Sequence, residues 1–208
     1  MTMRRAWIFG LLFLAGPVFA APAEHGITGL RVIPLTETVN EVTNFTPDGR
    51  AAKIVRAYDN SAWLYLVMVK SRRGDSSGGE GWNVVPWRNR EGRLVEPILD
   101  APHTGEDYVR SIAFAHGRID GEDATLLIES ERNLAGIPIP DAAPVTYSVY
   151  RFENSTGAFA GDIEVFDLVR SWDAPRKFCN ANLAMRAEFG FPVADYEAAL
   201  PQPDGCLR

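Results

Sequence analysis

The stretch of residues 53–69 reads KIVRAYDNSAWLYLVMV and carries the pattern from which the fold class follows. Its first part alternates between two faces, one of which carries Ile54 and Tyr58, and such alternation is typical of a β-strand. Ala62 to Val69 is apolar on both faces, as expected of a strand in the middle of a sheet. Asp59-Asn60-Ser61 supplies turn residues between the two parts. This stretch therefore predicts an antiparallel hairpin.

A second hairpin is expected in the middle of the chain. Tyr108 to Ala115 and Ala124 to Ser130 are strand-like, and Asp120-Gly121 between them is a hairpin-turn signal. Before this pair, Trp82 to Trp87 predicts a further strand. Ser71 to Gly81 is polar and without periodicity, so we interpret it as a mobile loop that joins two strands.

A third hairpin completes the fold class. Val145 to Phe152 and Asp162 to Arg170 are expected to pair, with Asn154-Ser155-Thr156-Gly157 as their turn. Strands at this regular spacing favour antiparallel pairing over βαβ units. We therefore predict a mainly β protein, built as an antiparallel sheet, a sandwich or an open barrel, with residues 21–208 as a single domain.

The N-terminus has the layout of a secretory signal peptide. Arg4 and Arg5 precede an apolar run from Ala6 to Leu14, and the segment ends on the small-residue pattern Val18-Phe19-Ala20. The apolar run is too short to span a bilayer comfortably. We predict that residues 1–20 are cleaved off, and we expect no transmembrane segment in the chain that remains.

Composition and charge limit the compartment and the partners. The chain has 208 residues, 46% hydrophobic and 23% charged, which excludes a disordered or collagen-like protein. Its net charge of -6 argues against nucleic acid as a partner. Of its 21 basic residues only Lys53, Lys70 and Lys177 are lysines, as in GC-rich bacterial coding sequences. With the signal peptide, this predicts a periplasmic or secreted bacterial protein.

The end of the chain changes from strand to helix. Good helix formers run from Asn180 to Phe189, the first of these can cap the helix, and Gly190 ends it. Cys179 and Cys206 form an even pair, which in an exported chain favours a disulfide. In the chain-entropy model such a bridge stabilises by about 3.6 kcal/mol. The expected C-terminus, residues 179–208, is thus a short α-helical extension pinned by a disulfide.

One part of the chain resembles a known family. Residues 48–60 read DGRAAKIVRAYDN, and the next strand leads to Trp82-Asn83-Val84-Val85-Pro86. Over residues 48–86 the chain resembles the periplasmic carbapenem self-resistance proteins of the CarG type. Where that family has an Asn-Ala-His element at the bend, this chain has Asn60-Ser61-Ala62-Trp63, so no functional residue is transferred. The resemblance implies a small exported β-rich protein that protects the cell against a β-lactam without a recognised hydrolytic site.

One loop and one strand end carry residue types that bind divalent metal ions. His103, Glu106 and Asp107 lie close together in sequence, and His116 follows at the end of the next predicted strand. If the sheet folds the loop back over His116, these four residues form a site in which a metal-bound water is the nucleophile. This predicts an alternative function, a metal-assisted hydrolase.

Two further segments bear on function. A basic patch in this acidic protein is a candidate site for an anionic ligand or a partner's acidic face, because Arg binds carboxylates in bidentate fashion. It consists of Arg72, Arg73, Arg88, Arg90 and Arg93. The segment Gly74-Asp75-Ser76-Ser77-Gly78-Gly79 looks like the nucleophile loop of chymotrypsin-type proteases, but an extra serine replaces a glycine. We interpret it as a polar loop.

No complete set of catalytic residues stands in the sequence. We therefore expect an exported binding or interaction protein rather than an enzyme, with no cofactor and with a small-molecule or protein partner in the cell envelope. Protection against a β-lactam is the role that the resemblance implies. Two alternatives stay open: the metal-assisted hydrolase described above, and an accessory component of an envelope assembly.

Overall fold

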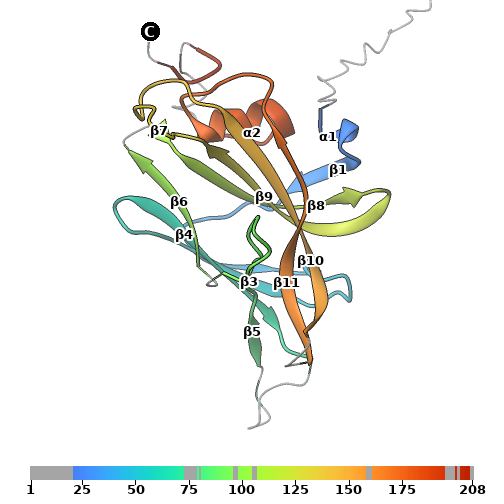
Figure 1. Cartoon of the computed structure of the whole chain (residues 1–208). Coiled ribbons are helices and arrows are strands. Elements are labelled where there is room, and N and C mark those ends of the chain that lie inside the picture. The colour runs from blue at the N-terminus through green and yellow to red at the C-terminus, as the bar shows by residue number, and fades with distance from the viewer. Residues whose placement is uncertain are drawn as a thin grey trace, which may run out of the picture.

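The structure is a computed structural model that describes residues 21–72, 79, 81–95, 98–104, 107–157, 161–194, 200 and 202–206. The expected signal peptide, residues 1–20, lies outside this part. The described strands form two antiparallel sheets, and a nine-residue helix lies against one of them (Figure 1). This confirms the mainly β class. Within the described ranges, no helix is long and apolar enough to cross a membrane.

The first sheet has the strand order β1-β8-β9-β10-β11. Its strands are β1 (Ile27–Val32), β8 (Arg110–Ile119), β9 (Glu122–Arg132), β10 (Val145–Gly157) and β11 (Gly161–Asp173), and a short helix, α1 (Ala21–Glu24), precedes β1. β8 and β9 turn at Asp120 and Gly121, whose φ angles are 52° and 88°. Two successive positive φ angles are what a tight two-residue hairpin requires, so the second predicted hairpin is confirmed.

The second sheet has the strand order β2-β3-β4-β6-β7, and β5 also pairs with β4. Its strands are β2 (Thr38–Val42), β3 (Ala52–Tyr58), β4 (Ala62–Lys70), β5 (Trp82–Val84), β6 (Ile98–Thr104) and β7 (Asp107–Tyr108). The antiparallel pair β3 and β4 confirms the hairpin predicted from residues 53–69. In its turn Asn60 has a φ of 72°, a conformation that asparagine tolerates better than most residues.

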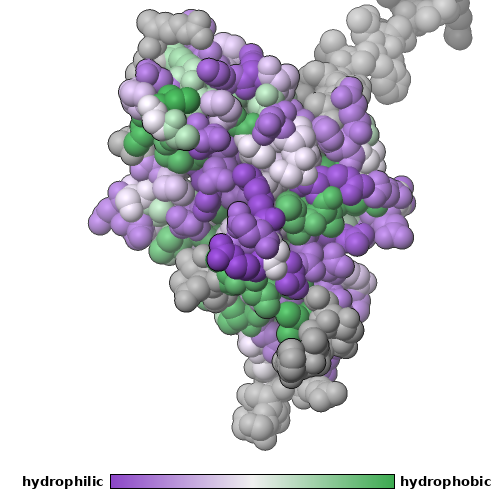
Figure 2. All heavy atoms as spheres, viewed as in Figure 1, coloured by the Kyte–Doolittle hydropathy of each residue, from purple (hydrophilic) through white to green (hydrophobic). Residues whose placement is uncertain are grey.

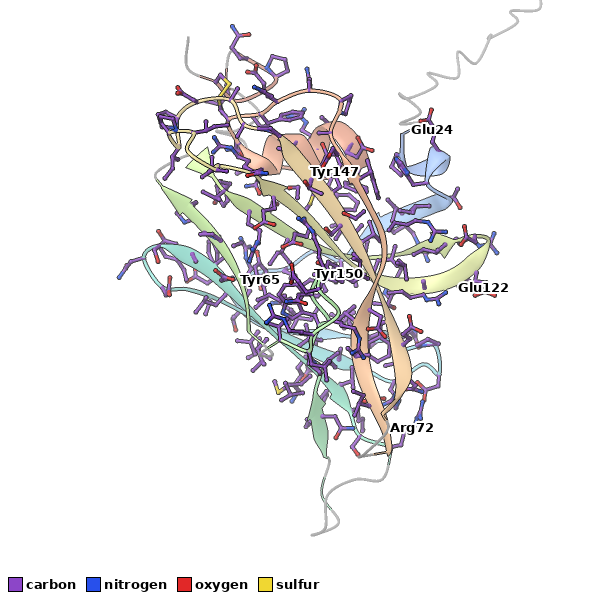
Figure 3. The ribbon with its side chains drawn as sticks, in the orientation of Figure 1. Glu24, Tyr65, Arg72, Glu122, Tyr147 and Tyr150 are labelled. Carbon is purple, nitrogen blue, oxygen red and sulfur yellow. A yellow bond between two sulfur atoms is a disulfide. The ribbon has the colours of Figure 1, made fainter. Side chains whose placement is uncertain are left out.

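The first sheet lies between the second sheet and the C-terminal helix. Alternate residues of a strand point to opposite faces, and both faces are buried here. Phe114 and Tyr150 point to the second sheet, where they share a core cluster with Ile54. Tyr147 points the other way and packs in a second cluster with Met185 of the helix. Figure 3 shows Tyr150 between the sheets and Tyr147 close to the helix.

The helix α2 (Ala181–Phe189) begins and ends where the sequence predicts. The side chain of Asn180 accepts hydrogen bonds from the backbone N–H groups of Asn182 and Leu183 at 2.8 and 3.2 Å, which caps the N-terminus. Gly190 ends the helix with a φ of 72°.

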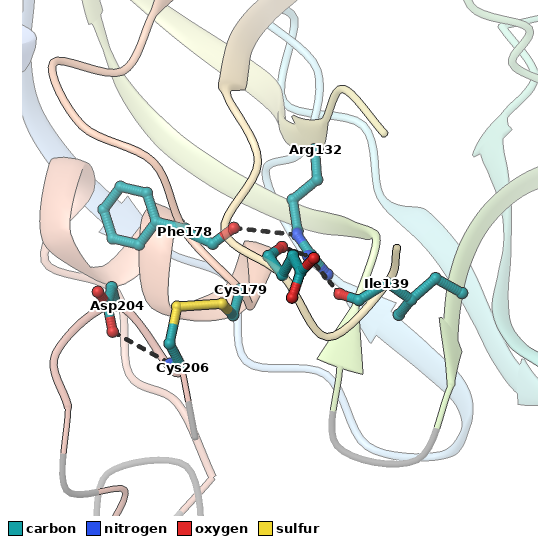
Figure 4. Close-up of a disulfide and its surroundings, with 7 residues drawn as sticks. Arg132, Ile139, Phe178, Cys179, Asp204 and Cys206 are labelled. Carbon is teal, nitrogen blue, oxygen red and sulfur yellow. Dashed lines mark hydrogen bonds between the residues drawn. A yellow bond between two sulfur atoms is a disulfide. The ribbon is translucent and has the colours of Figure 1, made fainter. Parts of the chain in front are cut away.

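A disulfide joins Cys179 and Cys206, as predicted (Figure 4). It ties the residue before α2 to the C-terminal tail. Beside it, the buried guanidinium of Arg132 donates hydrogen bonds to the carbonyl oxygens of Phe178 and Ile139. These contacts hold the proline-rich segment after β9 and the segment before α2 in one place.

Two predicted boundaries are wrong. Asn154 to Gly157, predicted as a turn, continues β10 in register with β11. Polar turn-forming residues extend this strand because the pairing with β11 supplies their backbone hydrogen bonds. The strand predicted from Trp82 to Trp87 ends at Val84, since Pro86 lacks the N–H group that a sheet ladder needs. Trp87 forms only an isolated bridge to Phe166.

Candidate ligand-binding site

A cavity of about 390 Å³ is lined by residues of both sheets. Its wall includes parts of β3, β4, β6 and β8, the segment after β1, and the chain that follows α2. The lining is largely apolar and aromatic, and it includes Trp63, Tyr65, Tyr108, Phe114 and Phe191. Small-molecule sites in proteins have volumes of roughly 300 to 1,000 Å³ and linings of this kind.

Strand pairing places a charged side chain on this wall. In the β3–β4 pair, Ile54 lies opposite Val67 and points into the core between the sheets. Arg56, two residues further along, therefore points to the same face and lies opposite Tyr65. A cation at a core-facing position loses part of its hydration, which costs free energy unless a partner compensates for it.

Arg56 has few partners of its own. The centre of its guanidinium lies 3.9 Å from the centroid of the Trp63 ring, and one terminal nitrogen donates to the carbonyl oxygen of Leu35 at 3.3 Å. Its Nε atom is buried and has no hydrogen-bond partner. Among the described residues, no carboxylate forms an ion pair with Arg56, so its charge is not neutralised by the protein there.

A cluster of stacked rings supports the Trp63 side of the cavity. The rings of Tyr58 and Trp63 lie 5.1 Å apart, and His103 stacks between Tyr58 and Tyr108 at centroid distances of 5.4 and 4.9 Å. Trp63 also donates its indole N–H to the hydroxyl of Tyr108 at 3.4 Å. These contacts fix the aromatic surface on which Arg56 lies.

The second arginine in the cavity wall, Arg110, forms ion pairs with three carboxylates. Its nitrogens lie 3.0 Å from Asp100, 3.0 Å from Glu129 and 2.7 Å from Glu131. Arg90 reaches two of these carboxylates from the segment between β5 and β6, and its Nη2 lies 3.9 Å from Glu129 and 3.5 Å from Glu131. That segment crosses the middle of the face seen in Figure 2, which is strongly hydrophilic there. The carboxylates therefore neutralise Arg110.

Glu129 is the most buried acid of this network, with 5% of its surface exposed. Burial raises the pKa of Glu129, against the opposing effects of Arg110 and of the hydroxyl of Tyr150, which donates to it at 3.1 Å. Burial also raises the pKa of Tyr65. The cavity thus has a neutralised ionic network on one side and a single unpaired guanidinium on the other.

The basic patch predicted from the sequence is divided among several partners. Three of its arginines pair with carboxylates of the protein: Arg72 with Asp48, Arg88 with Asp167, and Arg90 with Glu131. Arg93 is exposed, and Arg73 lies outside the described residues. Binding of an anion by this patch stays a prediction, and the loop at residues 74–78 also falls outside the described ranges.

The proposed metal ligands lie in different surroundings. His103 is on β6 of the second sheet within the aromatic stack, while His116 is on β8 of the first sheet, with its Nδ1 3.2 Å from the hydroxyl of Thr125. Glu106 lies outside the described residues, and only the backbone of Asp107 is described. In the described part of the chain, no group of three or more His, Cys, Asp or Glu side chains could hold a metal ion. The metal site stays a prediction.

Sequence reasoning missed both arginines of the cavity. The signal for Arg56 was present, because it falls between Ile54 and Tyr58 in the same alternation and so belongs to their face. No comparable signal exists for Arg110, whose partners come from β6 and β9.

The fold and the site define a class: a two-sheet antiparallel β protein with a small-molecule-sized cavity between its sheets. No protein-family model and no curated protein sequence matches the chain. Among solved structures, the chain is similar to the one described as the crystal structure of CarG, with a TM-score of 0.55 and 17% identity, over 80% of this chain and 97% of that chain. At this identity the similarity shows a shared fold over most of the chain.

Proposed function

We propose that the protein is an exported binding protein that holds a small, largely apolar molecule in the cavity between its sheets. The observation that carries this proposal is the cavity itself, with its aromatic lining and one unpaired cation. The disulfide supports export, because such bonds persist in oxidising compartments.

A β-lactam is the ligand that the resemblance to CarG-type proteins implies. A molecule of this class is small enough for a cavity of about 390 Å³ and carries an apolar body. Binding alone lowers the free concentration of an antibiotic, so protection needs no chemical step. This account fits a protein whose sequence lacks a complete set of catalytic residues.

A cavity-filling substitution tests the proposal. Leu35 lines the cavity from the segment after β1 and is only partly buried, so Leu35→Trp fills space with little disturbance of the core. We expect calorimetric titration with a carbapenem or a penicillin to show binding to the wild type. The variant should bind about tenfold more weakly or worse, a loss of about 1.4 kcal/mol.

Leu94→Trp is the matched control, because Leu94 is an exposed leucine, 48% accessible, outside the cavity lining. It should bind like the wild type. Binding that Leu35→Trp leaves unchanged would place the ligand elsewhere, and absence of binding to the wild type would contradict the proposed function.

A further inference from the structure

We infer that Arg56 recognises a carboxylate, so that the cavity selects small apolar molecules that carry one carboxylate group. The inference rests on the proposed function, because it names the ligand chemistry of the same cavity. It goes beyond that function in assigning the recognition to one side chain at a core-facing position of β3.

Arg56 has hydrogen-bonding capacity that the protein does not satisfy. Its buried Nε has no partner, and its other polar contacts go to neutral groups. A terminal nitrogen donates to the carbonyl oxygen of Leu35, and the guanidinium also interacts with the hydroxyl of Tyr65. A guanidinium presents five N–H groups in a fixed fork that matches a carboxylate. A carboxylate that accepts from the terminal nitrogens would supply the missing negative charge.

The guanidinium of Arg56 is held in one orientation before any ligand binds. The ring of Trp63 lies 3.9 Å from the guanidinium centre, and Leu35 accepts from one end of the fork. Trp63 is in turn fixed by Tyr58 and Tyr108. A guanidinium whose orientation is fixed before binding loses less conformational entropy when a ligand arrives.

The other cation in the cavity wall, Arg110, is already neutralised by carboxylates of the protein. Arg110 already has Asp100, Glu129 and Glu131 as partners, so an added anion at that end would meet negative charge. Arg56 is therefore the place where a ligand anion gains most. The apolar part of the ligand would then contact the aromatic lining, such as Phe114 and Phe191.

The test compares acids with their uncharged esters. Calorimetric titration uses benzylpenicillin, its methyl ester, octanoate and methyl octanoate with the wild type and with Arg56→Met, which keeps an apolar stem over Trp63. We expect each acid that binds the wild type to bind at least about tenfold more tightly than its ester. This is the gain in affinity expected from a hydrogen bond between charged groups. In Arg56→Met this preference should disappear, while ester affinity stays unchanged.

Arg118→Met is the control for a general change in charge, because Arg118 is an exposed arginine, paired with Asp123, that does not line the cavity. It should keep the preference for acids. Unchanged ester binding by Arg56→Met also shows that the variant is folded. Tighter binding of both acids than of their esters supports the inference. Tighter binding of benzylpenicillin alone also supports it, and shows that the shape of the apolar body contributes to affinity.

Two results would overturn the inference, and they differ in what they say about the cavity. Equal binding of acid and ester by the wild type, lost in Leu35→Trp, removes the role of Arg56 but leaves a ligand cavity. No binding of any acid or ester removes the proposed function, and the inference falls with it.

Discussion

Asp48 shows how one side chain joins distant parts of the chain. Its carboxylate accepts hydrogen bonds from the hydroxyl of Thr46 and from the Nε atoms of Arg50 and Arg72, both at 3.0 Å. Arg50 also pairs with Glu164 of β11, so the group connects the turn before β3 to the first sheet. Burial alone would raise the pKa of Asp48, but its three donors outweigh burial and hold this pKa well below the usual 3.8.

Asp48→Asn is expected to lower the free energy of unfolding near neutral pH, by an amount that shrinks in acid. The pKa of this carboxyl is lower in the folded than in the unfolded state. Its contribution to stability is therefore fully present above pH 3.8 and is lost as the pH falls through the folded-state pKa. Urea denaturation of both proteins from neutral to strongly acidic pH measures the difference.

Glu37→Gln is the control for this pH series, because Glu37 is an exposed acid between β1 and β2. Its stability profile should run parallel to that of the wild type. A difference between Asp48→Asn and the wild type that stays the same at every pH would contradict the assigned role of the carboxylate.

Among the elements, α2 depends most on contacts outside itself. A helix of nine residues is too short to be stable alone in water. The hydroxyls of Tyr147 and Ser130 donate to its backbone carbonyls at 3.0 and 2.7 Å. Gly205 of the tail approaches so closely that a Cβ there would lie 2.8 Å from the Cβ of Asn180, the capping residue. Sheet and tail together therefore stabilise the helix.

Removing the disulfide is expected to lower the free energy of unfolding by about 3.6 kcal/mol, which is the value that the chain-entropy model gives for a loop of this length. In the wild type the two cysteines are separated by 27 positions in sequence. Denaturant unfolding of the wild type and of the double variant Cys179→Ser/Cys206→Ser measures the difference in stability. Limited proteolysis of the double variant should cut the tail first. Reductant serves as the control, since it should destabilise the wild type and leave the variant unchanged. Equal unfolding free energies of the wild type and the double variant would contradict a stabilising role of the disulfide.

In the whole molecule, the first sheet is covered on both faces, by the second sheet on one and by α2 on the other. Trp87, in the segment after β5, forms a bridge to Phe166 of β11, and the cavity wall includes Arg56 and Arg110. Because β8 and the residues after α2 both contribute to this wall, the pinned C-terminus also helps to shape the candidate binding site.

Export is a prediction about the whole chain. When the full sequence is expressed in a bacterium with a Sec pathway, mass spectrometry of the periplasmic fraction should find a protein that begins at Ala21. A version without residues 1–20 is the control and should stay in the cytoplasm with its two cysteines reduced. Recovery of the intact chain with Met1 from the membrane fraction would contradict cleavage and favour an anchored protein.

The sequence predicted local structure well where neighbouring residues determine it. The alternation around Ile54, the Asp120-Gly121 turn and the Asn180 cap all act within a few residues, and each is present in the structure. β1, β2 and β6 were missed, because their sequences carry weak alternation and only pairing with neighbouring strands makes them strands. The turn predicted after Phe152 was wrong for the same reason, since β11 holds those residues extended.

The mainly β class, the hairpins, the C-terminal helix and the pairing of two cysteines could all be predicted from the amino-acid sequence, because each depends on short-range pattern or on a single possible partner. Which charges are compensated could be seen only once the strands were placed in space. Arg110 is neutralised by carboxylates of other strands, whereas Arg56, at an inward position of β3, is not. Electrostatic compensation depends on distance in space, and strands far apart in sequence set that distance.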